Sequence, residues 1–203
     1  MSTDRYRTIA REGTAQLREK ASRFIGIAFH IHDEGDFKER LHAFTREHHG
    51  ARHFCYAWVL GLEGDLQRAN DAGEPAGTAG RPILNRIQGA GLTYCGVVVV
   101  RYFGGTLLGK AGLVHAYGGT AALALADATT MEVPVCDQLQ LDLTYAQLEP
   151  VRSTVLRSGG AVTNMELTDR CRIIVEVPRN AVQPLIDLWH AQGILAQRMD
   201  QGK

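Results

Sequence analysis

The sequence predicts an α+β protein with two domains. In the last third of the chain, the apolar periodicity follows the order β-α-β-β-α-β, which is the ferredoxin-like pattern. The part before it mixes strands and helices around Val97–Val100, four valines in a row that indicate a strand buried on both faces. A chain of 203 residues is long enough for two small domains. We expect domains at 1–131 and 138–203, with a linker at about 132–137.

Composition is that of an ordinary globular protein. The chain is 45% hydrophobic and 22% charged, with no net charge and a pI near 7.1, which argues against a generally polycationic binder. The N-terminal residues are charged without an apolar signal segment, and no apolar run approaches the ~20 residues of a membrane span. Four widely spaced cysteines without a C-x-x-C pair indicate buried free thiols in a reducing compartment. We therefore expect a cytoplasmic protein with no membrane partner.

The first domain shows four strand-like runs, a fifth segment that can pair with one of them, and three helix-like runs. The helix expected over Asp33–His49 has apolar residues spaced by one and two turns, with Asp33 or Asp36 as its N-cap and Gly50 as its stop. The fifth segment, Leu62–Ala69, is expected to pair with the strand at His53–Leu60 through a glycine turn. The remaining helices are expected at Pro82–Gly89 and Leu113–Ala128. The strands are expected at Thr14–Lys20 as an edge strand, Arg23–Ile31, His53–Leu60 and Tyr94–Phe103.

The sequence pattern of the second domain predicts four strands and two amphipathic helices. The first helix carries Leu148, Val151 and Val155 on one face and stops at Gly159. The second is expected to be capped by Asn180 and to end at Gly193. A turn at Thr168–Asp169 joins the middle two strands. The strands are expected at Leu139–Tyr145, Ala161–Leu167, Cys171–Val177 and Ile194–Met199.

Two glycine-rich loops flank the valine strand, and each runs into an expected helix. Glycine loses more backbone freedom on folding than other residues, so this concentration indicates positive φ or a close approach of the backbone to something else. The start of a helix after such a loop offers free N–H groups and a positive dipole end, which favour an anion. The residues of interest in the first loop are Asp71, Gly73, Glu74, Pro75, Gly77, Thr78 and Gly80. Those in the second are Gly104 and Gly105, followed by Gly109 and Gly112.

Positive charge is concentrated in the same stretch. Residues 72–126 hold one acid, Glu74, against four basic residues: Arg81, Arg86, Arg101 and Lys110. Tyr102 follows Arg101 directly and could stack on a base. Charge combined with stacking is how single-stranded RNA is held. A small local excess of arginine on a solvated face is the alternative explanation.

The second loop nearly matches a P-loop. G-G-T-L-L-G-K-A has the spacing of G-x-x-x-x-G-K-[ST], but Ala111 stands where the magnesium-binding hydroxyl is needed. This argues against a P-loop NTPase and leaves either a phosphate-binding loop or a tight strand-to-helix turn. Asp71 and Glu74 could act as an acid/base pair or could bond neighbouring backbone N–H groups. The paired histidines lack a third ligand at suitable spacing, so no metal is expected.

The longest motifs resemble those of the IMPACT/YigZ family. The matching runs are A-R-H-F-C-Y-A-W-V (51–59), G-E-P-A-G-T-A-G-R-P-I-L (73–84), V-V-V-V-R-Y-F-G-G-T-L-L-G (97–109) and G-L-V-H-A-Y (112–117). The resemblance extends over essentially the whole chain. Two positions depart from the family pattern. Ala72 replaces the second Asp of D-D-G-E-P, and Ala111 replaces a usual Gly.

The resemblance implies a fold and a general function. The first domain should be a β-α sandwich similar to domain IV of elongation factor G, and the second should be similar to domain V of that factor. Eukaryotic members of the family regulate translation by binding an activator of the kinase that inhibits initiation. The likeness to the elongation factor suggests contact with RNA or the ribosome, which is an analogy at the level of the fold.

Three functions are therefore weighed. The favoured one is a non-enzymatic regulator of translation that binds RNA, the ribosome or a translation-associated protein. Its contacts would come from Arg81, Arg86, Arg101, Tyr102, Gly104, Gly105 and Lys110. The second is an enzyme that cradles a phosphorylated ligand in the two glycine loops, with Glu74 as the candidate base. The third is a protein-interaction adaptor. No catalytic residue, metal or cofactor is assigned.

Overall fold

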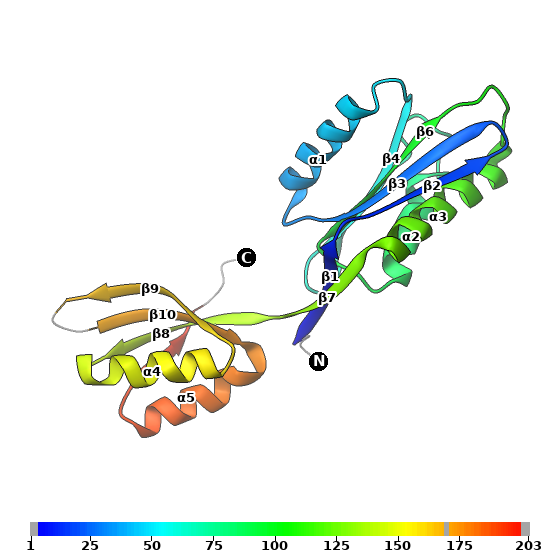
Figure 1. The fold of residues 1–203 in the computed structure, drawn as a ribbon. Helices are drawn as coiled ribbons and strands as arrows, with labels where there is room; N and C mark the ends of the chain where they lie inside the picture. Colours follow the sequence, from blue (N-terminus) through cyan, green and yellow to red (C-terminus); the bar gives the residue numbers. More distant parts are fainter. Residues whose placement is uncertain (1–3, 169–170, 200–203) are drawn as a thin grey trace. The chain divides into compact units, whose positions relative to one another are not determined.

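The structure is a computed structural model that describes residues 4–168 and 171–199. The chain forms two compact units (Figure 1). The N-terminal unit spans Tyr6–Val133, and the C-terminal unit contains the residues from Pro134 onward together with the residues before Tyr6. Each unit encloses its own hydrophobic core. Both units combine helices with an antiparallel sheet, so the α+β class is confirmed. Among the described helices, none is both long and apolar enough to cross a bilayer.

The N-terminal unit is built on a five-stranded antiparallel sheet in the order β2-β3-β6-β4-β5. The central strand is β6 (Cys95–Tyr102), whose first seven residues are buried, as the four valines predict. Its neighbours are β3 (Ser22–His30) and β4 (His53–Leu60). The edges are β2 (Gly13–Glu19) and β5 (Leu66–Asn70). The predicted edge strand and the predicted pairing of β5 with β4 are confirmed.

One face of this sheet is covered by α1 (Glu34–Glu47) (Figure 1). Phe37 and Phe44 of α1 pack with Phe29 and Trp58 of the sheet. Asp33 is the N-cap, since its carboxylate accepts a hydrogen bond from the backbone N–H of Asp36 at 2.8 Å.

The other face is covered by two helices, α2 (Gly80–Gly89) and α3 (Gly109–Asp127) (Figure 1). Glycines permit close packing here, because a Cβ added at Gly26 would lie 2.9 Å from the Thr120 side chain of α3. The sequence predicts that α3 begins at Leu113, whereas it begins four residues earlier. Tertiary packing of Leu113 and Ala116 on the sheet overrides the low helix propensity of Gly109 and Gly112.

The C-terminal unit has the predicted β-α-β-β-α-β order. Its four-stranded sheet runs β11-β8-β10-β9, and the pairings are antiparallel. The elements are β8 (Cys136–Leu143), α4 (Tyr145–Arg157), β9 (Ala161–Leu167), β10 (Cys171–Pro178), α5 (Val182–Ala191) and β11 (Leu195–Arg198). The core lies between sheet and helices, with Trp189 and Val155 fully buried.

Several local predictions differ from the structure. Asn180 does not cap α5, because it lies inside a short 3-10 turn (Arg179–Ala181) and Ala181 is the residue before the helix. Strands β1 (Arg5–Arg11) and β7 (Thr129–Pro134) are not predicted, and they pair as a separate two-stranded sheet. Strand β7 extends into the segment expected as a linker. Of the expected turn at Thr168–Asp169, Asp169 lies outside the described residues.

Candidate functional site

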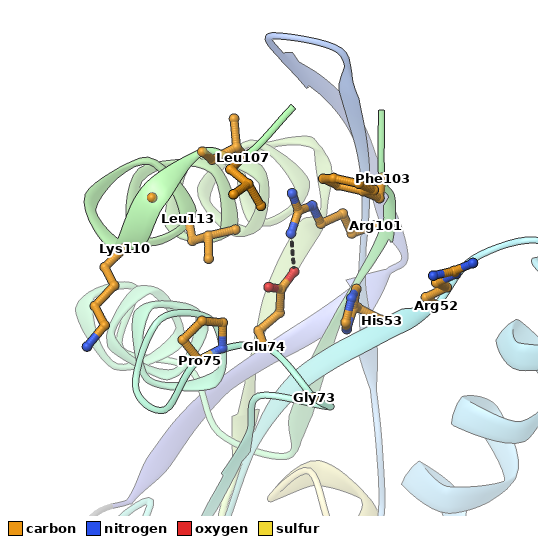
Figure 2. A pocket seen from close by; sticks show the side chains of 12 residues that line it. Arg52, His53, Gly73, Glu74, Pro75, Arg101, Phe103, Leu107, Lys110 and Leu113 are labelled. Atoms are coloured by element: carbon orange, nitrogen blue, oxygen red, sulfur yellow. Dashed lines mark hydrogen bonds and ion pairs between the residues drawn. The ribbon is translucent and has the colours of Figure 1, made fainter. Parts of the chain in front are cut away.

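The two glycine-rich loops meet at one end of the N-terminal unit and enclose a pocket of about 400 Å³, which we call the loop pocket. Its walls come from the start of β4, the loop before α2, the end of β6 and the start of α3 (Figure 2). The volume lies in the range of small-ligand sites, which is about 300–1,000 Å³. The residues that line it are Arg52, His53, Gly73, Glu74, Pro75, Arg101, Phe103, Leu107, Leu108, Gly109, Lys110 and Leu113.

A buried ion pair lies at the centre of the loop pocket. The Arg101 guanidinium donates to Glu74 Oε1 at 2.6 Å, and the two side chains are 6% and 5% exposed (Figure 2). The Tyr117 hydroxyl donates to the same oxygen at 2.8 Å, and Arg101 donates to Ser22 Oγ at 3.3 Å. Removing one partner of such a buried pair leaves a charge unpaired, which typically costs about 3–5 kcal/mol.

Two polar atoms of this ion pair have no partner among the described residues. Arg101 Nε is fully buried and makes no hydrogen bond. Glu74 Oε2 receives no donor, because both hydrogen bonds to this carboxylate go to Oε1. Figure 2 shows Oε2 directed away from Arg101, toward Pro75 and Leu113. Buried polar atoms without partners are rare in folded proteins, so Arg101 Nε requires an explanation. Glu74 Oε2 is not one of the buried unpaired atoms, and it faces the pocket.

Asp71 organises the first glycine loop and occupies N–H groups at the start of α2. Its carboxylate accepts from the backbone N–H groups of Gly77 at 2.8 Å and of Ala79 and Gly80 at 2.9 Å. Partial burial opposes the charged form, but the three N–H donors outweigh it and lower the pKa of Asp71. The N–H groups that favour an anion at a helix start are therefore occupied by the protein's own carboxylate.

The start of α3 is different, because it opens onto the loop pocket. Within the described residues, α3 has no side-chain N-cap and no acidic residue in its first turn. Its first residues, Gly109 and Lys110, line the pocket, and Lys110 is exposed. Figure 2 shows Lys110 on one side of the Glu74–Arg101 pair and Arg52 on the other. This end of α3 combines a positive helix dipole with a lysine charge, and both favour an anionic ligand.

The cationic residues singled out in the sequence occupy two places. Arg101 and Lys110 line the loop pocket. Arg81 and Arg86 are exposed and line a second hollow of about 410 Å³ between α2 and α3. The loop residues Gly73, Glu74 and Pro75 line the loop pocket, whereas Gly77 lines the second hollow. The basic residues between positions 72 and 126 therefore do not form one continuous site.

Tyr102 and Arg101 lie on opposite faces of the sheet. Successive side chains of a strand point to opposite faces, and Tyr102 packs on the α1 side. There its hydroxyl lies 3.0 Å from Nδ1 of His48, and the guanidinium of Arg23 covers its ring at 4.3 Å. The aromatic residue beside the loop pocket is Phe103, whose ring centroid lies 5.2 Å from the Arg101 guanidinium.

The sequence did not indicate the roles of several residues in and around the loop pocket. Ser22 and Tyr117 hold the ion pair from β3 and α3, which are far from Glu74 along the chain. His53 carries its proton on Nδ1, because that atom lies 2.9 Å from the Ala72 carbonyl oxygen, which can only accept. The signal available in the sequence was the run A-R-H-F-C-Y, which lies in a stretch of family resemblance.

Glycines 104 and 105 have different structural roles in the second loop. A Cβ at Gly104 would lie 1.9 Å from the Ala21 carbonyl oxygen, so that position admits no side chain. Gly105 has a φ of +84°, in the region that favours glycine. Both roles shape the backbone of the loop. Neither residue is among those that line the loop pocket.

The nearby thiols are not activated nucleophiles. Burial raises the pKa of Cys55 to about 12, and its Sγ donates to the Asp71 carbonyl oxygen at 3.0 Å. Burial also raises the pKa of Tyr117, so its hydroxyl remains a donor to Glu74. Across residues 4–168 and 171–199, no three His, Cys, Asp or Glu side chains converge as a metal site.

Comparison with known proteins agrees with this two-unit α+β architecture. Residues 20–125 match the family model of the Impact N-terminal domain, which covers β3 to α3 and includes every residue of the loop pocket. A solved structure titled as a hypothetical protein superposes with a TM-score of 0.79 at 30% identity, and the match covers 99% of this chain and 100% of that one.

Three bacterial relatives match most of the chain. The IMPACT family member YigZ of Escherichia coli (strain K12) is 40% identical over 149 residues, which cover 72% of this chain and 73% of the relative. An IMPACT family member of Haemophilus influenzae is 44% identical over 136 residues, covering 66% of each chain. YvyE of Bacillus subtilis is 32% identical over 153 residues, covering 75% of this chain and 70% of the relative. The chain belongs to the IMPACT family.

Proposed function

We propose that the chain is a non-catalytic regulator of translation that binds single-stranded RNA across the loop pocket. The observation that carries this proposal is the chemistry of the pocket lining. It contains three cationic side chains, Arg52, Arg101 and Lys110, against one acid, Glu74. The remaining side chains include the exposed Phe103 and Leu107. Single-stranded nucleic acid is held by this combination of cations for the phosphates and flat apolar surfaces for the bases.

The contacts of Glu74 support a binding role. Its carboxylate is paired with Arg101 and also accepts from Tyr117, so its position is fixed by the protein. The charge of Arg101 is offset by its ion pair with Glu74, so the phosphate contacts are assigned to the exposed Lys110 and Arg52.

Salt-dependent RNA binding tests the proposal. We expect affinity for a fluorescein-labelled oligouridylate, measured by anisotropy, to fall linearly with the logarithm of the salt concentration. Each phosphate contact to a single strand contributes about 0.7 to that slope, so Lys110→Ala should reduce it by about 0.7. Arg46→Ala is the matched control, since Arg46 is an exposed residue in the last turn of α1, on the opposite face of the sheet.

Binding that is independent of salt, or a Lys110→Ala slope equal to that of wild type, would contradict the proposal. Arg101→Glu is a poor probe of the same question. It would place a second carboxylate beside the buried Glu74 and would disturb the fold.

A protein-interaction adaptor is the second candidate, and one observation favours it. Leu107 is 82% exposed and Phe103 is 46% exposed on the same loop. Exposed apolar residues of this kind mark protein interfaces as well as base-stacking surfaces. Leu107→Ser separates the two functions, because it removes apolar surface without adding charge: it should abolish capture of a protein partner while leaving the salt slope for RNA, which reports phosphate contacts, unchanged.

A further inference from the structure

One carboxylate oxygen in the loop pocket is an acceptor without a donor. Glu74 is 5% exposed in its side chain, and its Oε1 accepts from Arg101 and Tyr117. Among the described residues, no group donates to Oε2, which is directed into the pocket (Figure 2). Hydrogen bonds to a charged acceptor are stronger than those between neutral groups, so a donor that reaches this oxygen is held well. The position therefore favours a ligand that brings an N–H or O–H group to Oε2.

A free donor belongs to the same ion pair. Arg101 Nε is fully buried and has no partner, although its terminal nitrogens bond Glu74 and Ser22. The ion pair thus has one unpaired acceptor and one unpaired donor. The buried Nε is closed to a ligand, so the ligand's hydrogen bond is assigned to Oε2, and every nucleobase carries an N–H donor on its Watson–Crick edge.

The charge of the lining excludes a cationic ligand. An ammonium group could also donate to Oε2, but Arg101 already neutralises Glu74 at 2.6 Å. Arg52 and Lys110 add two further positive charges to the lining. A ligand that is anionic overall, with a neutral N–H donor, satisfies both the charge and the acceptor.

The walls suit a flat group. Pro75, Phe103 and Leu113 line the pocket, whose volume of about 400 Å³ is sufficient for a small planar ring system. Lys110 and Arg52 lie on opposite sides of the ion pair (Figure 2). Phosphates on both sides of an inserted base could each approach one of these cations.

We infer that the loop pocket receives one unstacked nucleobase of the bound strand and that Glu74 Oε2 accepts a hydrogen bond from an N–H group on its Watson–Crick edge. The inference rests on the proposed function, because it names what enters the pocket when RNA crosses it. Glu74 then reads a donor on the base edge, Arg101 positions the Glu74 carboxylate, and Lys110 and Arg52 hold the backbone.

The test removes the hydrogen-bond donor from the Watson–Crick edge of the ligand. Uracil has a single Watson–Crick donor, N3–H, so an oligomer in which every residue is N3-methyluridine lacks it. An oligomer of 5-methyluridine is the matched control, because its methyl group lies on an edge without that donor. For wild-type protein, we expect the N3-methyl oligomer to bind at least about tenfold more weakly than either the unmodified or the 5-methyl oligomer.

Glu74→Gln supplies the complementary change in the protein. Because Oε1 accepts from both Arg101 and Tyr117, the amide oxygen should take that place and the amide NH₂ should take the place of Oε2. The acceptor then becomes a donor. We expect the variant to lose at least about tenfold in affinity for the unmodified oligomer and to show no difference between the unmodified and N3-methyl oligomers.

The outcomes separate the inference from the proposed function. Salt-dependent binding that is equal for all three oligomers would overturn the inference and leave the RNA-binding proposal standing. No binding of the unmodified oligomer at low salt would overturn both. If Glu74→Gln fails to fold, as judged by circular dichroism, the comparison of oligomers on wild-type protein still decides the question.

Discussion

Asp71 is predicted to be the residue that holds the first glycine loop in place. Asp71→Ala removes an acceptor from three backbone N–H groups. Gly77 is exposed, so its N–H regains water at little cost, but Ala79 and Gly80 are buried. A hydrogen bond to a charged group contributes about 1.5–3 kcal/mol, so two buried ones at the low end give a loss of about 3 kcal/mol.

Urea unfolding of the N-terminal unit measures this loss. The two tryptophans lie in different units, Trp58 in the N-terminal one and Trp189 in the C-terminal one. In a Trp189→Phe background, fluorescence therefore reports on the N-terminal unit alone. Asp187→Ala, on an exposed position of α5, is the matched control and should leave the transition of Trp58 unchanged. A loss below about 1 kcal/mol for Asp71→Ala would show that these hydrogen bonds do not hold the loop in place.

The Asp71 carboxylate also makes the stability of the folded protein depend on pH in a defined direction. The pKa of Asp71 is lowered in the folded state, so its contribution is fully present above the unfolded value of about 3.9 and is lost as the pH falls through the folded value. The difference in stability between wild type and Asp71→Asn should be constant from neutral pH to about pH 5 and should shrink below about pH 4. A difference that grows on acidification would contradict the assignment.

Three further changes have defined outcomes. Gly104→Ala should destabilise the N-terminal unit by more than about 2 kcal/mol in urea, because its Cβ would overlap the Ala21 carbonyl oxygen; a loss of a few tenths would contradict this geometry. Ala72→Gly should raise the free energy of unfolding by about 0.5–1 kcal/mol, since Ala72 has a φ of +44°; destabilisation would show that the methyl group matters more than the backbone. Titration of the folded protein with Ellman's reagent should modify Cys136 alone, because the other three thiols are buried; rapid modification of a second thiol would contradict that burial.

The sheet and the major helices could be predicted because their signals are local. Four successive valines indicate the central strand, and the spacing of Phe37, Leu41 and Phe44 indicates α1. Strands β1 and β7 escaped prediction because they are largely exposed, so they lack a clear apolar face. The early start of α3 could not be predicted, since glycine propensity argues against it and packing with distant strands decides it.

The candidate site was predictable only in part. Both glycine loops were identified, and they do line one pocket. The separation of Arg101 from Tyr102 follows from strand alternation and could have been deduced from the sequence. The pairing of Arg101 with Glu74 could not, because it joins residues 27 positions apart through the tertiary fold. The positive φ of Ala72 also has no signal in the sequence, since alanine rarely adopts it.

Photocrosslinking shows where RNA touches the protein. A short oligomer containing 4-thiouridine is irradiated with the protein, and the attached peptides are identified by mass spectrometry. If RNA crosses the loop pocket, the crosslinks concentrate at residues 101–113 and 73–75 and are suppressed by an excess of unlabelled oligomer. Crosslinks confined to α1 or to the C-terminal unit would show that RNA binds elsewhere and that the loop pocket is not its site.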